Sequence, residues 1–145
     1  MKHITRILTI ALFTFLLFSG TGFAQDANGS YFTMTKFKIS IPEGGSQAEL
    51  QEMLNEWQEK IVAGNEHIIS ERIMRHQSGA DSRDLVILTE YKDWNSIDMA
   101  GKKQNEIVDA AWATEDERKE FFSKFNKYFG NHADEIYVEV KGTRK

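Results

Sequence analysis

Acidic side chains occur inside two apolar segments of the sequence, where a carboxylate could take part in chemistry. Glu90 ends the apolar run Leu85–Leu88, and Glu139 lies within the segment "EIYVEV". A carboxylate that faces an enclosed space either pairs with a cation or has a raised pKa, which suits general acid–base work. Arg72, in another apolar segment, is a natural partner. The alternative is an ion pair between strands at the rim of a sheet, which contributes little stability.

His132 and Tyr137 are the other candidate acid–base groups. His132, in "GNHADE", could serve if its loop tips into a cavity; alternatively it is a polar turn residue near a helix C-terminus, where a protonated imidazole is mildly favourable. His67 and His76 would lie at opposite ends of one strand, roughly 30 Å apart, and cannot share a metal ion. The sequence has no cysteine, which excludes disulfides and thiolate sites. We therefore predict no metal and no cofactor.

The first residues have the pattern of a secretory signal peptide. Lys2 and Arg6 precede the apolar run Ile7–Phe18, and small residues at 22 and 24 precede a cleavage point. The run is too short to span a bilayer, so we predict a signal peptide at 1–24 and a flexible linker at 25–30. The mature protein is then expected to be exported and soluble, periplasmic or extracellular, without membrane contact after cleavage.

The mature chain is acidic and large enough for one domain. The leader holds two of the 18 basic residues and no acidic ones, which leaves 16 against 22 Asp and Glu and a net charge of −6. Nucleic-acid binding needs clustered positive charge, so we predict no nucleic-acid partner. A single α+β domain with one core is expected at 31–141, followed by a basic tail at 142–145.

The periodicity of the apolar residues and the helix-capping residues divide this domain into strands and helices. We predict strands at 31–41, 67–76 and 135–140, and a more apolar strand within 83–94. Capping boxes at Ser46–Glu49 and Thr114–Glu117 begin two helices, and a third helical pattern follows Asp93. Gly64 is expected to end the first helix in a left-handed conformation. The aromatic stripe that begins at Phe121 is expected to continue as helix to Phe129 and to close at Gly130.

This order of elements predicts a ferredoxin-like βαββαβ fold. Its four-stranded antiparallel sheet would carry the helices on one face only. The second face would hold Phe32, Met34 and Tyr137, mixed with the charged side chains of Lys36, Lys38 and Glu139. Exposed apolar patches of this size usually mark interfaces, so we predict that the chain pairs with itself, sheet against sheet, as a homodimer.

The element order and the stretch "LVILTEYKDWNSID" (85–98) resemble the dimeric α/β-barrel superfamily, which includes antibiotic-biosynthesis monooxygenases, stress-responsive barrel proteins and haem-degrading enzymes. The resemblance covers roughly residues 31–140. It implies a small-molecule cavity between two sheets, used without a cofactor in some members. Monooxygenase-type members carry a histidine early in the helix after the third strand, where this chain has Met99–Lys102. Trp94 lies near the tryptophan of haem-degrading members, but the first strand has no asparagine.

The sequence thus predicts an exported homodimeric α/β-barrel protein that binds a small, partly apolar molecule between its sheets. The alternatives are a cofactor-independent monooxygenase-like enzyme, a haem-binding barrel, and a sheet face that serves dimerisation alone. The ligand-binding candidates are Met34, Arg72, Trp94, Tyr137 and Glu139. The catalytic candidates are Glu90, His132, Tyr137 and Glu139.

Overall fold

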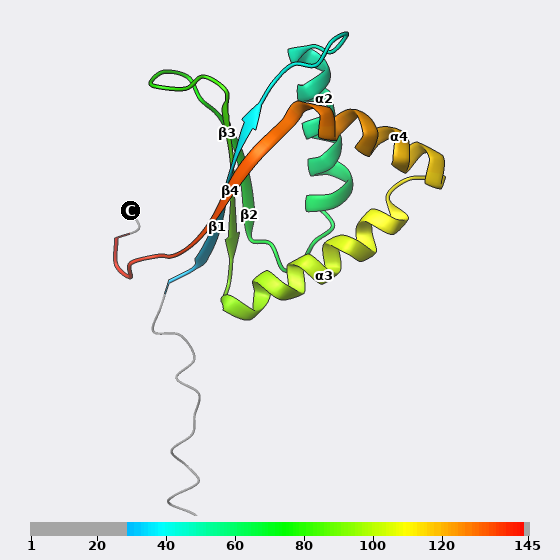
Figure 1. Cartoon of the computed structure of the whole chain (residues 1–145). Helices are drawn as coiled ribbons and strands as arrows, with labels where there is room; N and C mark the ends of the chain where they lie inside the picture. The colour runs from blue at the N-terminus through cyan, green and yellow to red at the C-terminus, as the bar shows by residue number, and fades with distance from the viewer. Residues whose placement is uncertain (1–28, 144–145) are drawn as a thin grey trace, which may run out of the picture.

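The computed structural model describes residues 29–143 (Figure 1). The predicted signal peptide, residues 25–28 of the predicted linker and the last two residues of the predicted tail lie outside the described residues. Among the described helices, none has the length and apolar character needed to cross a membrane.

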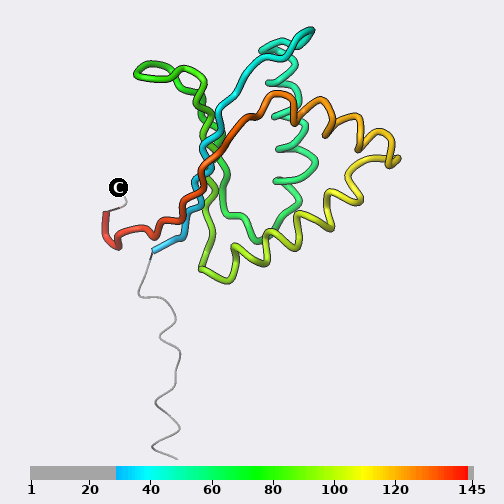
Figure 2. The backbone as a smooth tube through the Cα atoms, viewed as in Figure 1, coloured from blue at the N-terminus to red at the C-terminus, as the bar shows by residue number. Residues whose placement is uncertain are grey.

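The four strands form one antiparallel sheet. They are β1 (Tyr31–Ile39), β2 (Ser70–Arg75), β3 (Asp84–Tyr91) and β4 (Phe129–Val138), and their order in the sheet is β2-β3-β1-β4. The helices α2 (Gln47–Trp57), α3 (Trp94–Ala110) and α4 (Glu115–Phe125) all lie on the same side of the sheet, as Figures 1 and 2 show. The ferredoxin-like βαββαβ prediction is confirmed.

The N-terminus of α2 is closed by a tyrosine from the far end of the chain. The Ser46 hydroxyl accepts the Glu49 N–H at 3.0 Å, as the capping box predicts. The Ser46 N–H, however, donates to the Tyr128 hydroxyl at 3.0 Å, and that hydroxyl donates to the Glu49 carboxylate. The box is therefore completed by tertiary structure, which fixes α2 against the start of β4.

The prediction that Gly64 ends the first helix in a left-handed conformation is wrong. Helix α2 continues into a π-helical turn, η1 (Gln58–Val62), whose last turn closes through the Ala63 N–H on the Gln58 carbonyl at 2.9 Å. Gly64 does not have a positive φ. The buried Asn65 fixes the turn instead, since its side chain accepts the His67 N–H and donates to the Ala100 carbonyl of α3.

The last strand begins earlier than predicted, because Phe129 and Gly130 belong to β4 and not to the preceding helix. A short 3₁₀ turn, η2 (Asn126–Tyr128), separates α4 from β4. Phe129 pairs with Ile39 across a register shift, and its ring packs edge-on against Phe37 at 5.0 Å. A Cβ at Gly130 would lie 3.1 Å from the Lys38 carbonyl oxygen, so glycine allows this close approach.

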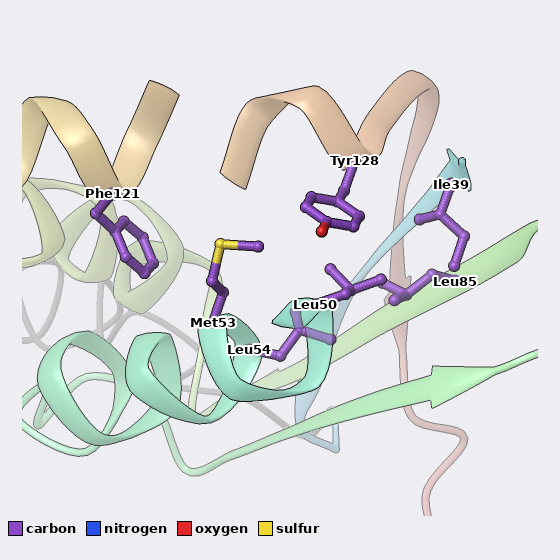
Figure 3. Close-up of a cluster of buried hydrophobic side chains, with 7 residues drawn as sticks. All are labelled: Ile39, Leu50, Met53, Leu54, Leu85, Phe121 and Tyr128. Atoms are coloured by element: carbon purple, nitrogen blue, oxygen red, sulfur yellow. The ribbon is translucent and has the colours of Figure 1, made fainter. Parts of the chain in front are cut away.

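The core lies between the sheet and helices α2 and α4. Figure 3 shows Leu50 and Met53 of α2 directed toward Tyr128 and Phe121. The buried cluster is completed by residues from β1, β3 and α2: Ile39, Leu85 and Leu54. Burial of such side chains is the main stabilising contribution to the fold.

No helix within residues 29–143 lies over the second face of the sheet, which we call the open face (Figure 1). Residues that pair directly across antiparallel strands point to the same side, so the register assigns this face. It carries Ser70, Arg72 and Met74 of β2, Val86, Leu88 and Glu90 of β3, Phe32, Met34 and Lys36 of β1, and Ala133, Glu135 and Tyr137 of β4. The predicted mixture of apolar and charged residues is thus confirmed.

Candidate functional site

A pocket of about 390 Å³ lies on the helix side of the sheet, between the central strands and the three helices. We call it the inner pocket. Six aromatic side chains line it, and they come from five elements: Phe37, Trp57, Tyr91, Phe122, Phe125 and Phe129. The polar lining comes mainly from the sheet, as Thr33, Thr35, Glu71, Thr89 and Tyr91. A largely apolar cavity with a few convergent polar groups is the usual form of a small-molecule site.

The aromatic rings hold one another in place. The Trp57 ring stacks on Phe125, with centroids 6.0 Å apart and an interplanar angle of 9°, and meets Phe122 edge-on at 6.3 Å. Phe125 in turn contacts Phe129 at 4.6 Å. These contacts join α2, α4 and β4, so one wall of the pocket is rigid.

Glu71 of β2 is the one carboxylate among the residues that line the inner pocket. It accepts hydrogen bonds from the Thr89 hydroxyl at 2.9 Å and from the Gln58 amide at 2.6 Å. Burial raises the pKa of Glu71, and the two hydrogen bonds oppose that effect in part. No Lys, Arg or His within residues 29–143 forms an ion pair with it. Glu71 is therefore a half-buried carboxyl group whose hydrogen-bond partners are both neutral.

Hydroxyl groups continue this polar edge along β1. The Thr33 hydroxyl donates to the Tyr91 oxygen at 3.4 Å, and the Thr35 hydroxyl donates to Asp134 at 2.8 Å. Together with Glu71, these groups give the sheet side of the pocket a hydrogen-bonding wall, while Trp57, Phe122 and Phe125 line it from the helices.

The open face holds a smaller pocket, of about 210 Å³, which we call the outer pocket. It brings together three residues singled out in the sequence, Arg72, Glu90 and Glu139, beside Phe32, Ser70 and Leu88. Glu90 is only 5% exposed and accepts a hydrogen bond from the Ser70 hydroxyl at 3.0 Å. The predicted cluster of Arg72 with carboxylates therefore exists, on the face where a second copy would pack.

Two other predicted ligand-binding residues share the open face but do not line the outer pocket. Met34 lies between Leu88 and Glu135 in the register, and Tyr137 lies opposite Phe32 and is half exposed. Trp94 lies elsewhere. It begins α3, is exposed, and meets the Tyr31 ring edge-on at 6.0 Å.

His132 is not in a turn, as the sequence suggested, but within β4. It pairs with Phe37 on the helix side of the sheet, with ring centroids 5.1 Å apart. Its Nε2 atom lies 3.1 Å from the Asp134 carboxylate. The prediction of a turn is wrong because β4 begins at Phe129, which places "GNHADE" in the strand. His132 is not among the residues that line either pocket.

A groove of about 520 Å³ between α2 and α4 is mostly charged. Two of its carboxylates form ion pairs within their own helical segments: Glu56 with Lys60 at 2.8 Å, and Glu120 with Lys124 at 2.7 Å. Glu49 bonds to Tyr128. These contacts account for the groove as a solvated surface.

Glu71 was missed in the sequence. Alternation along "SERIMR" does not show which side chains face the helices, because both sets of alternating residues contain a charged and an apolar member. The side is decided by the strand register, in which Glu71 pairs with Thr89 and Ile73 pairs with Ile87. This register puts Glu71 and Ile73 on the helix side of the sheet.

Comparison with known proteins supports the fold. No family model matches the chain, and no curated protein does. A candidate antibiotic biosynthesis monooxygenase from Caulobacter crescentus matches with a TM-score of 0.51 and 14% identity, over 79% of this chain and 92% of its own. SnoaB, a cofactor-independent oxygenase from Streptomyces nogalater, matches with a TM-score of 0.52 and 8% identity, over 81% and 99%. A dimeric ferredoxin-like protein from an uncultured marine organism matches with a TM-score of 0.50 and 14% identity, over 81% and 93%. At such low identity, the likeness establishes the fold alone.

Proposed function

We propose that the chain binds a small, partly apolar molecule in its inner pocket. The observation that carries the proposal is the cavity of about 390 Å³ with an aromatic wall and a hydrogen-bonding wall. The sequence had suggested a site between two sheets. The inner pocket instead lies within one subunit, which leaves the open face available for a second copy.

The working form in this proposal is an exported homodimer that pairs through the open face. Its apolar members pair across the strands, Met34 with Leu88 and Val86 with Met74, and Leu88 is only half-buried in the single chain. Exposed apolar side chains that lie side by side in this way are commonly covered in an assembly. One of the structures that share the fold is a dimeric ferredoxin-like protein. Export follows from the leader pattern in residues 1–24.

A pocket-filling substitution tests the site. Gln104 lines the inner pocket from α3 and is half-buried, so Gln104→Trp should fill the cavity without removing a core residue. Lys102→Trp, on the exposed surface of the same helix, is the matched control. We expect native mass spectrometry to detect a co-purified small molecule, or an added apolar fluorescent probe to bind, with wild type and Lys102→Trp but not with Gln104→Trp. Equal probe binding by both variants would refute the inner pocket as the site.

A second candidate function is a cofactor-independent monooxygenase. The observation that favours it is Glu71 in the inner pocket, because a raised pKa makes its ionised carboxylate a stronger base, which can take a proton from a substrate. The oxygenase SnoaB shares the fold. Oxygen uptake with hydroxylated aromatic compounds tests this function. Activity should fall in Glu71→Gln with its pH profile lost, whereas turnover that does not depend on Glu71 would exclude this role.

A further inference from the structure

The inner pocket has an unusual balance of charge. Glu71 is the sole acidic or basic side chain among its lining residues, and the rest of the lining is aromatic, aliphatic, hydroxyl or amide. The nearest basic residue on the same face of β2 is Arg75, four residues along the strand and roughly 13 Å away between Cα atoms. Arg75 lines a neighbouring pocket with Glu71, and no ion pair joins the two within the described residues. A negative charge on Glu71 is therefore not neutralised by an ion pair with any residue between 29 and 143.

The charged groups beside the pocket on β4 do not change this balance. Asp134 lies on the helix side of the sheet and accepts the Thr35 hydroxyl, which itself lines the pocket. The Nε2 atom of His132 lies 3.1 Å from the Asp134 carboxylate and so is directed to that group. The side chains that border the pocket on β1 and β4 thus add no net positive charge that could serve Glu71.

The aromatic wall supplies the second element of cation recognition. The faces of tryptophan and phenylalanine rings carry negative potential and attract ammonium groups. Trp57 of α2 stacks almost parallel on Phe125 of α4 and meets Phe122 edge-on, and all three rings line the cavity together with Glu71. A cavity that combines a carboxylate with such rings is suited to an organic ammonium group on an apolar body.

We infer that the inner pocket takes an organic cation, with its ammonium group beside Glu71 and its apolar body against the ring of Trp57 and its neighbours. This inference rests on the proposed function, because it specifies the ligand of that same pocket. A bound ammonium group would supply the counter-charge that the protein withholds. It would also lower the raised pKa of Glu71 on binding.

Three probes with the same aromatic body test the inference: 2-phenylethylammonium, 2-phenylethanol and phenylacetate. We expect calorimetric titration at neutral pH and low salt to show the cation binding about tenfold tighter than the alcohol, with the anion weakest. In Glu71→Gln the affinity for the cation should fall by about tenfold, and the affinity for the alcohol should stay within about twofold. Glu59→Gln, an exposed change of equal charge on η1, should leave both affinities at their wild-type values.

The outcomes separate the inference from the proposed function. Equal binding of alcohol and cation by wild type, or preference for the anion, would overturn the inference and keep the small-molecule site. A preference for the cation that survives in Glu71→Gln would overturn it as well. Failure of all three probes to bind would count against both. If circular dichroism shows that Glu71→Gln does not fold, the relative affinities of wild type for the three probes still test the inference.

Discussion

Asn65 is predicted to hold the turn before β2 against the middle of α3. It is 4% exposed, its amide donates to the Ala100 carbonyl at 2.9 Å, and its carbonyl accepts the His67 N–H at 3.2 Å. The residue therefore sets the position of α3, which brings Gln104 to the inner pocket. Replacing its side chain should loosen both the fold and the site.

The cost of Asn65→Ala follows from these two bonds. Each neutral hydrogen bond contributes about 1 kcal/mol net, and the groups left behind in a buried site add to this, so we expect a loss of about 2 to 3 kcal/mol. For a domain of this size the melting temperature should fall by roughly 10 °C. Asn65→Asp should be worse at neutral pH, because a buried carboxylate would face the Ala100 carbonyl oxygen. At acidic pH the difference in stability between Asn65→Asp and wild type should become smaller, because the protonated carboxyl group of Asn65→Asp can donate a hydrogen bond to the Ala100 carbonyl.

Urea unfolding followed by tryptophan fluorescence, at one fixed protein concentration, measures these differences. Asn55→Ala is the control, because the exposed Asn55 accepts one hydrogen bond from Gln51 at 2.9 Å and should change stability by less than about 0.5 kcal/mol. The reasoning is refuted if Asn65→Ala costs no more than this control, or if Asn65→Asp is the more stable variant at neutral pH.

Three further predictions concern charge, assembly and processing. Because the pKa of Glu71 is raised, the folded state keeps the Glu71 proton to higher pH than the unfolded chain does. The stability that this protonated group contributes is therefore lost as pH rises from 4.5 through the raised pKa. Urea titrations should show that Glu71→Gln gains stability relative to wild type between acidic and neutral pH, and a difference that does not change with pH would contradict this. Leu88→Lys places a second cation beside Arg72 at the centre of the open face and should give a monomer in sedimentation, whereas Ser123→Lys on the exposed surface of α4 should remain a dimer. Intact-mass measurement of the protein recovered after export should give a chain that begins at Gln25, and retention of Met1 would exclude cleavage.

Local signals in the sequence were sufficient for the types and order of the elements. Ser46 and Thr114 cap the helices predicted for them, with hydrogen bonds of 3.0 and 3.2 Å to the N–H groups three residues on. Alternation along β1 correctly separates Phe37 and Ile39 from Met34. These features depend on neighbours within a few residues, so they can be inferred from the linear sequence.

The boundary at β4 could not be inferred in this way. The spacing from Phe121 through Phe125 to Phe129 continues a helical pattern, and only pairing with β1 makes Phe129 the first residue of a strand. The position of His132 changed with it, from a turn to the strand. Strand pairing between distant segments overrides a local pattern when it satisfies the backbone and buries the same ring.

The sequence by itself determined the succession of strands and helices, the one-sided cover of the sheet and the mixed character of its open face, because these are set by residue type and period. Only the tertiary structure decided which carboxylate is enclosed. Glu71 acquires its environment from Thr89 on the next strand, Gln58 after α2 and the rings of α2 and α4. Burial depends on which distant segments come into contact. When both faces of a strand carry polar and apolar residues, the local sequence does not indicate which face will be buried.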